Sequence, residues 1–208
     1  MQLWQGVRSH CRLRASLEQV ARFTAFLLLG GGLLLFAAGC AASRPGGGSP
    51  ADGSGAAAAV QVIPGVPFLP QEEDTCGPSS LAMLLRFHGK QATTRELVEE
   101  TRTAGLRGTL ITDLAAAARG RGLPAEVTEL DLAGLRRRIA AGEPVILLVD
   151  LGAWAWSRPH YLLAYGVNRE GVVAHSGRTA GMVIPFAKLA RQWEKMGRLA
   201  VVAPREGK

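Results

Sequence analysis

The chain has 208 residues, of which 48% are hydrophobic and 20% charged, a composition that is ordinary for a globular protein and excludes an intrinsically disordered one. Three cysteines are too few for a fold held together by disulfides. The formal net charge is +7, but the basic residues are scattered, and their one cluster, Arg136 to Arg138, lies in an expected helix without interleaved aromatic residues. We therefore expect a solvated helix face there and no nucleic-acid partner.

The N-terminal segment follows the order of a secretory signal. Arginines precede an apolar run at 23–36, and small residues follow it. This run is shorter than the roughly 20 apolar residues that a membrane-spanning helix needs. Positive charge before the run places the rest of the chain outside the cytoplasm.

The end of this segment, Ala37-Ala38-Gly39-Cys40, resembles the lipobox of bacterial lipoproteins. The resemblance implies that residues 1–39 are a signal peptide and that Cys40 becomes the lipidated N-terminus. Ala41 stands where an acidic residue would favour the inner membrane, so the outer membrane is the expected location.

Residues 40–60 consist mainly of Gly, Ser, Pro and Ala and show no apolar periodicity, which predicts a flexible tether behind the lipidated cysteine. The folded domain is expected over 61–208, enough residues for one hydrophobic core.

The first half of this domain predicts a short strand and then four helices. Pro78 suits the first turn of the first helix and Gly89 its end. Thr93 and Glu96 form the capping box of the second helix. The expected elements are a strand at 60–63 and helices at 76–89, 93–101, 112–119 and 131–141.

In the second half of the domain, the spacing of apolar residues changes to one that is typical of strands. Five apolar segments are separated by turns, and a helix that opens at Pro185 interrupts them. Helices followed by hairpin-connected strands predict an α+β fold with an antiparallel sheet. The expected elements are strands at 145–151, 161–167, 172–174, 182–184 and 199–202, and a helix at 185–193.

Cys76 is the single cysteine of the expected domain, because Cys11 and Cys40 belong to the N-terminal segment. A lone cysteine is usually a small buried hydrophobic residue. Cys76, however, stands at the start of an expected helix, where backbone N–H groups and the helix dipole stabilise a thiolate. Its position therefore favours a nucleophile.

A cysteine nucleophile needs a base and an oxyanion hole. His88 lies about three turns along the same helix, on the order of 18 Å from Cys76, and is too far away. His160 opens an apolar strand and can face a helix start across a cleft. Gln71, shortly before Cys76, supplies an amide donor that can join a backbone N–H in an oxyanion hole.

The pattern of Gln71, Cys76-Gly77-Pro78 and the strand that starts at His160 resembles the C39 and C39-like cysteine peptidases of the papain-like superfamily. The resemblance covers about 66–202. It implies a papain-like α+β fold with N-terminal helices packed on an antiparallel sheet. It also implies attack on a peptide carbonyl by Cys76, with His160 as the base and Gln71 at the oxyanion.

The family usually has an Asp on the next strand, which orients the histidine; here His175 or Ser176 stands at that place. Side chains alternate along a strand, so only one of the two can point at His160. We predict His175, whose neutral ring can accept a hydrogen bond; Ser176 is the alternative, and Asn168 and Asp150 fit less well. With His175 in this role, activity should fall as the pH drops through about 6.5.

The sequence therefore predicts a membrane-anchored, extracytoplasmic cysteine peptidase that acts on a peptide or protein. The alternative is a catalytically weak papain-like lipoprotein that binds a peptide or a partner. No metal-ligand spacing and no phosphate loop are present, so neither a metal nor another cofactor is expected. A neighbouring transporter or secreted peptide is the further partner considered.

Overall fold

The computed structural model describes residues 60–72, 74–103, 105–153 and 155–205. The expected signal peptide, Cys40 and almost all of the tether lie outside the described residues. Within the described part, none of the helices has both the length and the apolar character that crossing a bilayer requires.

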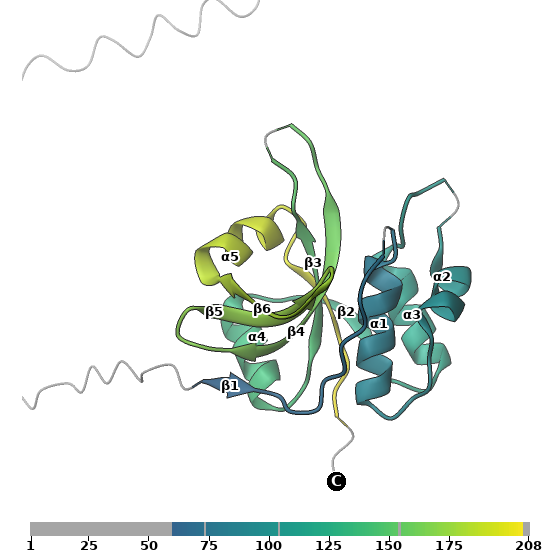
Figure 1. Ribbon diagram of the computed structural model, residues 1–208, viewed down its shortest axis with the longest axis horizontal. Helices are drawn as coiled ribbons and strands as arrows, with labels where there is room; N and C mark the ends of the chain where they lie inside the picture. The colour runs from purple at the N-terminus through teal and green to yellow at the C-terminus, as the bar shows by residue number, and fades with distance from the viewer. Residues whose placement is uncertain (1–59, 73, 104, 154, 206–208) are drawn as a thin grey trace, which may run out of the picture. The chain divides into compact units, whose positions relative to one another are not determined.

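Five helices and seven strands make up the described chain (Figure 1). The helices are α1 (Cys76–Phe87), α2 (Thr94–Thr101), α3 (Ile111–Gly120), α4 (Leu132–Ala140) and α5 (Phe186–Glu194). The strands are β1 (Gln61–Val62), β2 (Glu126–Glu129), β3 (Val145–Asp150), β4 (Pro159–Val167), β5 (Gly171–Ser176), β6 (Thr179–Pro185) and β7 (Leu199–Val202).

All seven strands join one antiparallel sheet in the order β2-β7-β3-β4-β5-β6, with β1 paired to β4. The central pair aligns Val149 with His160, and the next pair aligns Leu163 with His175. This arrangement confirms the predicted α+β class with an antiparallel sheet.

Strand β3 is buried on both sides because helices cover both faces of the sheet. Ile146 and Leu148 belong to the core shared with α1 and α3. Val145, Leu147 and Val149, on the opposite face by strand alternation, belong to the core shared with α4 and α5. Figure 1 shows the two helical groups on the two sides of the sheet.

Most predicted elements are found within a few residues of their expected bounds. The capping box of α2 is present: the Thr93 hydroxyl accepts from the Glu96 N–H at 3.2 Å, and the Glu96 carboxylate accepts from the Thr93 N–H at 3.0 Å. Strand β2 was not predicted. Its four residues, Glu126–Glu129, are exposed or half-buried and begin and end with Glu, so they lack the apolar signal of a core strand.

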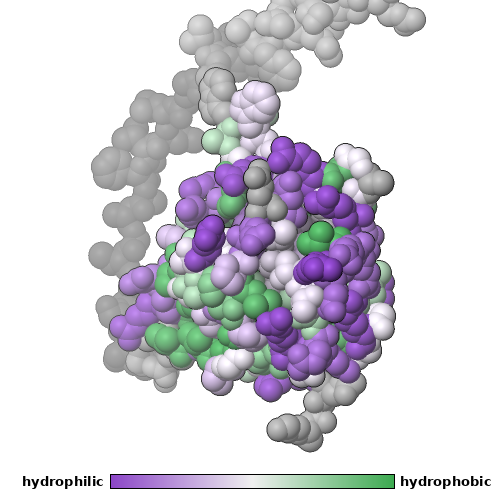
Figure 2. Space-filling model, turned by 45° about the vertical axis from the view of Figure 1, so that its right-hand side comes forward, coloured by the Kyte–Doolittle hydropathy of each residue, from purple (hydrophilic) through white to green (hydrophobic). Residues whose placement is uncertain are grey.

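The surface of the domain is largely hydrophilic, with apolar residues gathered in one area of the face that Figure 2 shows. Among the described residues, four large apolar side chains are exposed on two loops. Leu106 and Leu110 lie between α2 and α3, and Leu151 and Trp156 lie between β3 and β4. Both loops border the cavity described next.

Candidate active site

A cavity of about 680 Å³ opens beside the start of α1 and brings Gln71, Cys76 and His160 together from three separate segments. Gly177 also lines the cavity, and Glu72, Asp74, Arg107 and Arg158 supply charged side chains. Three of the four residues that the sequence predicted for catalysis therefore line the same cavity.

Cys76 is the first residue of α1, and the neighbouring glycine explains how closely β4 approaches it. A Cβ at Gly77 would lie 3.1 Å from the ring of Tyr161, tighter than an ordinary contact. The Tyr161 hydroxyl also donates to the carbonyl of Thr109 at 2.9 Å. Tyr161 thus packs β4 against the helix start and places its neighbour His160 at the cavity.

The thiol of Cys76 is half-buried, and this burial raises its pKa. Hydrogen bonds from the backbone N–H groups of Tyr161 and Gly77 favour the thiolate and offset part of this effect. The net direction is upward, so Cys76 rests as a thiol at neutral pH. The helix start therefore does not by itself produce the resting thiolate that the sequence suggested.

His160 is held by a hydrogen bond between its Nε2 and the Oγ of Ser176, 3.0 Å apart. Burial and, less strongly, the positive charge of Arg158 lower the pKa of His160 to about 4. The imidazole is therefore neutral at physiological pH and able to accept the proton of Cys76.

The hydrogen bond that His175 was expected to accept from His160 is absent, and Ser176 pairs with His160 instead, which corrects the predicted partner. The ring of His175 lies between Phe68 and Tyr165, with centroids 5.2 and 4.4 Å away. Its Nδ1 accepts from the Gly181 N–H at 3.2 Å, and its Nε2 lies 3.3 Å from the Val66 carbonyl. As alternation requires, one of the two adjacent side chains faces His160, and it is the hydroxyl.

Gln71 is buried, and its side-chain amide is fixed at both ends. The Oε1 accepts from the Gly177 N–H at 2.7 Å, while Nε2 donates to the Ser80 Oγ at 3.1 Å. Nε2 also lies 3.4 Å from the carbonyl oxygens of Cys76 and Tyr161. The donor end of the amide therefore lies beside the backbone of Cys76, close enough for a role in an oxyanion hole.

Sequence reasoning missed Ser80 and Gly177 as supports of Gln71. Ser80 follows Cys76 by one helical turn, and this spacing could have shown that both lie on the same side of α1. Gly177 carries no comparable signal, because its role depends on a backbone N–H that the fold brings to Gln71.

The other candidates serve different purposes. Asp150 accepts from the N–H groups of Gly152 at 2.6 Å and Arg158 at 2.8 Å, so it fixes the β3–β4 loop. Those two hydrogen bonds lower the pKa of Asp150. Asn168 closes the β4–β5 turn through the N–H groups of Glu170 and Gly171.

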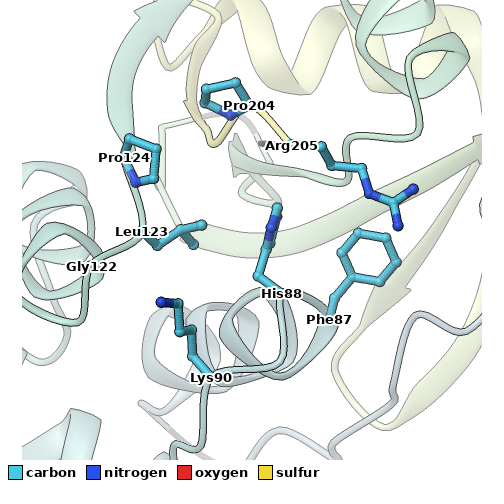
Figure 3. A pocket seen from close by; sticks show the side chains of 8 residues that line it. All are labelled: Phe87, His88, Lys90, Gly122, Leu123, Pro124, Pro204 and Arg205. Atoms are coloured by element: carbon cyan, nitrogen blue, oxygen red, sulfur yellow. The ribbon is translucent and has the colours of Figure 1, made fainter. Parts of the chain in front are cut away.

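His88 lies at the far end of α1, as the sequence predicted, and lines a separate cavity of about 230 Å³ with Lys90 and Leu123 (Figure 3). Among the residues that the structure describes, no group of three His, Cys, Asp or Glu side chains is placed to hold a metal ion.

A family model supplies the identification. The model described as "Peptidase C39 family" matches residues 67–207, about two thirds of the chain. The chain belongs to the Peptidase C39 family. The match spans Gln71, Cys76 and His160 as well as Ser176. A search of curated proteins found no match.

Three solved structures share the fold of this C39 chain. A C39-like peptidase from Bacillus anthracis has a TM-score of 0.59 at 20% identity, covering 72% of this chain and 99% of its own. The peptidase domain of Streptococcus ComA, a bi-functional ABC transporter involved in quorum sensing, has a TM-score of 0.57 at 22% identity, covering 67% and 99%. A double glycine motif protease from an AMS/PCAT transporter, solved with a leader peptide, has a TM-score of 0.52 at 20% identity, covering 70% and 98%.

These structures confirm the predicted C39-like, papain-like fold. Family and fold together are those of a cysteine peptidase-like hydrolase. The match covers 99% of the crystallised Bacillus anthracis chain and 99% of the crystallised ComA peptidase domain, so both crystallised chains hold little beyond this fold.

Exchanging the hydroxyl at Ser176 tests which residue orients His160. We expect Ser176→Ala to lower kcat about fivefold to tenfold, the effect of losing one net hydrogen bond of about 1 kcal/mol. Ser176→Asp should raise the pKa of His160, since a carboxylate stabilises imidazolium. The measurement is kcat against pH for both variants, with His175→Gln as the control. A larger loss from His175→Gln than from Ser176→Ala would restore His175 as the orienting residue.

The acid side of the pH profile is a second expected result. We expect His160 to act as the base only when neutral, so kcat/KM should stay high as the pH falls below 6.5 and decline only near pH 4. Burial also lowers the pKa of His175 below its usual value, so protonation of His175 does not produce a decline in activity at pH 6.5 either. A decline centred at pH 6.5 would show that His160 is more basic than its buried position requires.

Proposed function

We propose that the protein is a lipid-anchored, extracytoplasmic cysteine peptidase that cleaves peptide bonds with Cys76, His160 and Gln71. The observation that carries this proposal is the single cavity into which all three residues open, with the donor end of Gln71 beside the backbone of Cys76. The C39 family membership supports it.

The reaction begins when His160 accepts the proton of Cys76 and the sulfur attacks the carbonyl carbon of the substrate. Gln71 Nε2 and the backbone N–H of Cys76 stabilise the oxyanion that forms. Collapse of the intermediate breaks the C–N bond, and the amine leaves with the proton from His160. A water molecule, deprotonated by His160, then hydrolyses the thioester and regenerates the thiol.

A peptide substrate fits the rim of the cavity. Leu106 and Leu110 are about half exposed on one bordering loop, and Trp156 is 82% exposed on the other. Exposed apolar side chains on both sides of a cleft favour a partner with apolar side chains of its own. The AMS/PCAT protease, solved with a leader peptide, supports a peptide substrate. A neighbouring transporter or secreted peptide remains the proposed partner.

The alternative function is a peptide-binding module with weak or no catalysis. The observation that favours it is Ser176, because a hydroxyl stabilises imidazolium less than the carboxylate that usually orients the histidine. The thiol and imidazole therefore rest uncharged, which lowers the nucleophilicity of Cys76.

One experiment separates the two functions. The protein is incubated with a peptide mixture at neutral pH, and new termini are identified by mass spectrometry for the wild type, Cys76→Ala and His160→Ala. Termini that depend on both residues establish the peptidase. If peptides stay bound to the protein without being cleaved, and the wild type and Cys76→Ala bind them equally, the protein is the binding module instead.

We further propose that Cys40 carries the lipid anchor and that the protein is held at the outer membrane. Replacing Cys40 with alanine should abolish labelling by a fatty-acid precursor and leave the unprocessed chain, because the lipidated cysteine is the processing site of the lipobox. The measurement is lipid labelling together with the mass of the chain in membrane fractions. Unchanged labelling and mass in Cys40→Ala would refute the anchor.

A further inference from the structure

Exposed cations gather on the outer side of the α4–α5 layer. The basic face consists of Arg136 and Arg137 on α4 and Lys188 and Arg191 on α5, all of them exposed. None of the four forms a salt bridge with a residue that the structure describes. Their charges are therefore available to an external partner.

The four side chains belong to one layer of the domain, because α4 and α5 both pack on the same face of the sheet. The guanidinium of Arg136 lies 4.7 Å from the ring centroid of Phe186, the first residue of α5. Lys188 and Arg191 are three residues apart and so share a side of α5. Leu189 and Trp193 turn the other side of α5 into the core, which directs the basic face outward.

Few carboxylates balance this charge. Asp131 accepts from the N–H of Gly134 at the start of α4, and Glu143 pairs with Arg138 at 2.9 Å. Glu194 is the remaining exposed acid of α5. Helix α2, on the other side of the sheet, instead carries three glutamates within eight residues. Positive charge is thus concentrated on the side formed by α4 and α5.

The basic face also lies next to the point where the chain enters the domain. Helix α4 packs against β1, the first described strand, and Figure 1 shows the two side by side. The expected tether, 41–60, joins the chain just before this strand. A flexible tether of this length spans on the order of 25 Å, so an anchored domain stays close to the bilayer.

We propose that the basic face binds the anionic headgroups of the membrane to which the chain is tethered. This inference rests on the proposed lipid anchor. None of the residues that line the catalytic cavity belongs to α4 or α5, so the cavity stays open when this face is docked. Docking orients the domain on the bilayer and keeps its cleft accessible to substrate.

Vesicle binding tests the proposal with the domain alone, since the ComA peptidase domain, which shares this fold, crystallised without the rest of its transporter. Residues 61–208 are mixed with vesicles of phosphatidylcholine, or of equal parts phosphatidylcholine and phosphatidylglycerol, and the bound fraction is measured by co-sedimentation. We expect binding only with phosphatidylglycerol, weakening as salt screens the charges. The Lys188→Glu/Arg191→Glu variant should bind at least about 25-fold more weakly, from about fivefold for each cation lost.

The matched control is Arg95→Glu/Arg102→Glu, which changes the net charge equally at two exposed cations on and beside α2. It should keep nearly full binding. Equal losses in the two variants, or no binding to phosphatidylglycerol, would overturn the proposal. Binding to duplex DNA as tight as to the vesicles would also overturn it, by showing a general polyanion surface. None of these results depends on peptide cleavage or on Cys40, so they are distinguishable from failure of the proposed function.

Discussion

Cys76→Ser is expected to reduce peptide cleavage by at least about 10³-fold while the protein stays folded. Serine is close to cysteine in shape, and its oxygen can accept the same backbone hydrogen bonds from Tyr161 and Gly77. A hydroxyl is a far weaker acid than a thiol, however. Beside His160, whose pKa is lowered to about 4, the serine oxygen is therefore a much poorer nucleophile than the cysteine sulfur. The measurement is kcat/KM together with the thermal unfolding temperature.

The control for this exchange is Ser79→Ala, a buried position of the same helix whose hydroxyl lies near Thr75 and Thr94 and does not line the cavity. It should lower stability slightly and keep activity. Cleavage by Cys76→Ser within about tenfold of the wild type would exclude the thiol mechanism.

Gln71→Glu should lower kcat by about 10²-fold to 10³-fold with a much smaller change in KM, the usual result of losing one oxyanion donor. Glutamate keeps an oxygen that can accept from the Gly177 N–H, and the thermal unfolding temperature checks that the variant stays folded. It replaces the Nε2 donor near Cys76 with an oxygen that repels the developing negative charge. Steady-state kinetics resolves kcat from KM.

Ser80→Ala is the companion variant, because it removes the hydroxyl partner of Gln71 Nε2 and leaves the donor itself in place. Only a loss of a few fold is expected from it. If Gln71→Glu keeps the wild-type kcat, Gln71 is a structural residue and the oxyanion is stabilised by backbone N–H groups alone.

The elements that could be predicted from sequence carry local signals. Helix α2 has a capping box, and β3 is an unbroken apolar run. Strand β2 could not be predicted, since its pairing with β7 joins residues far apart in the chain and only that pairing specifies it. The α+β class was predictable because the helical and strand periods occupy different halves of the sequence.

The candidate site likewise contains residues that the sequence could predict and one choice that it could not. Gln71, Cys76 and His160 could be named from motif and position. The choice between His175 and Ser176 could not, because the strand register shifts between Ala174 and Ser176 and again between Ala164 and Gly166. Each irregularity changes which side chains share a face. The uncharged state of Cys76 and His160 could not be predicted from the sequence either, since it follows from burial by residues of other elements.

The raised pKa of Cys76 should slow the oxidation of its thiol. Peroxides and small disulfides react with a thiolate, and a half-buried, protonated sulfur presents little of that form. The described domain holds no second cysteine with which it could cross-link. Cys76 should therefore stay reduced in an oxidising compartment. A cysteine held as a thiolate would attack its substrate faster but would also be oxidised more readily.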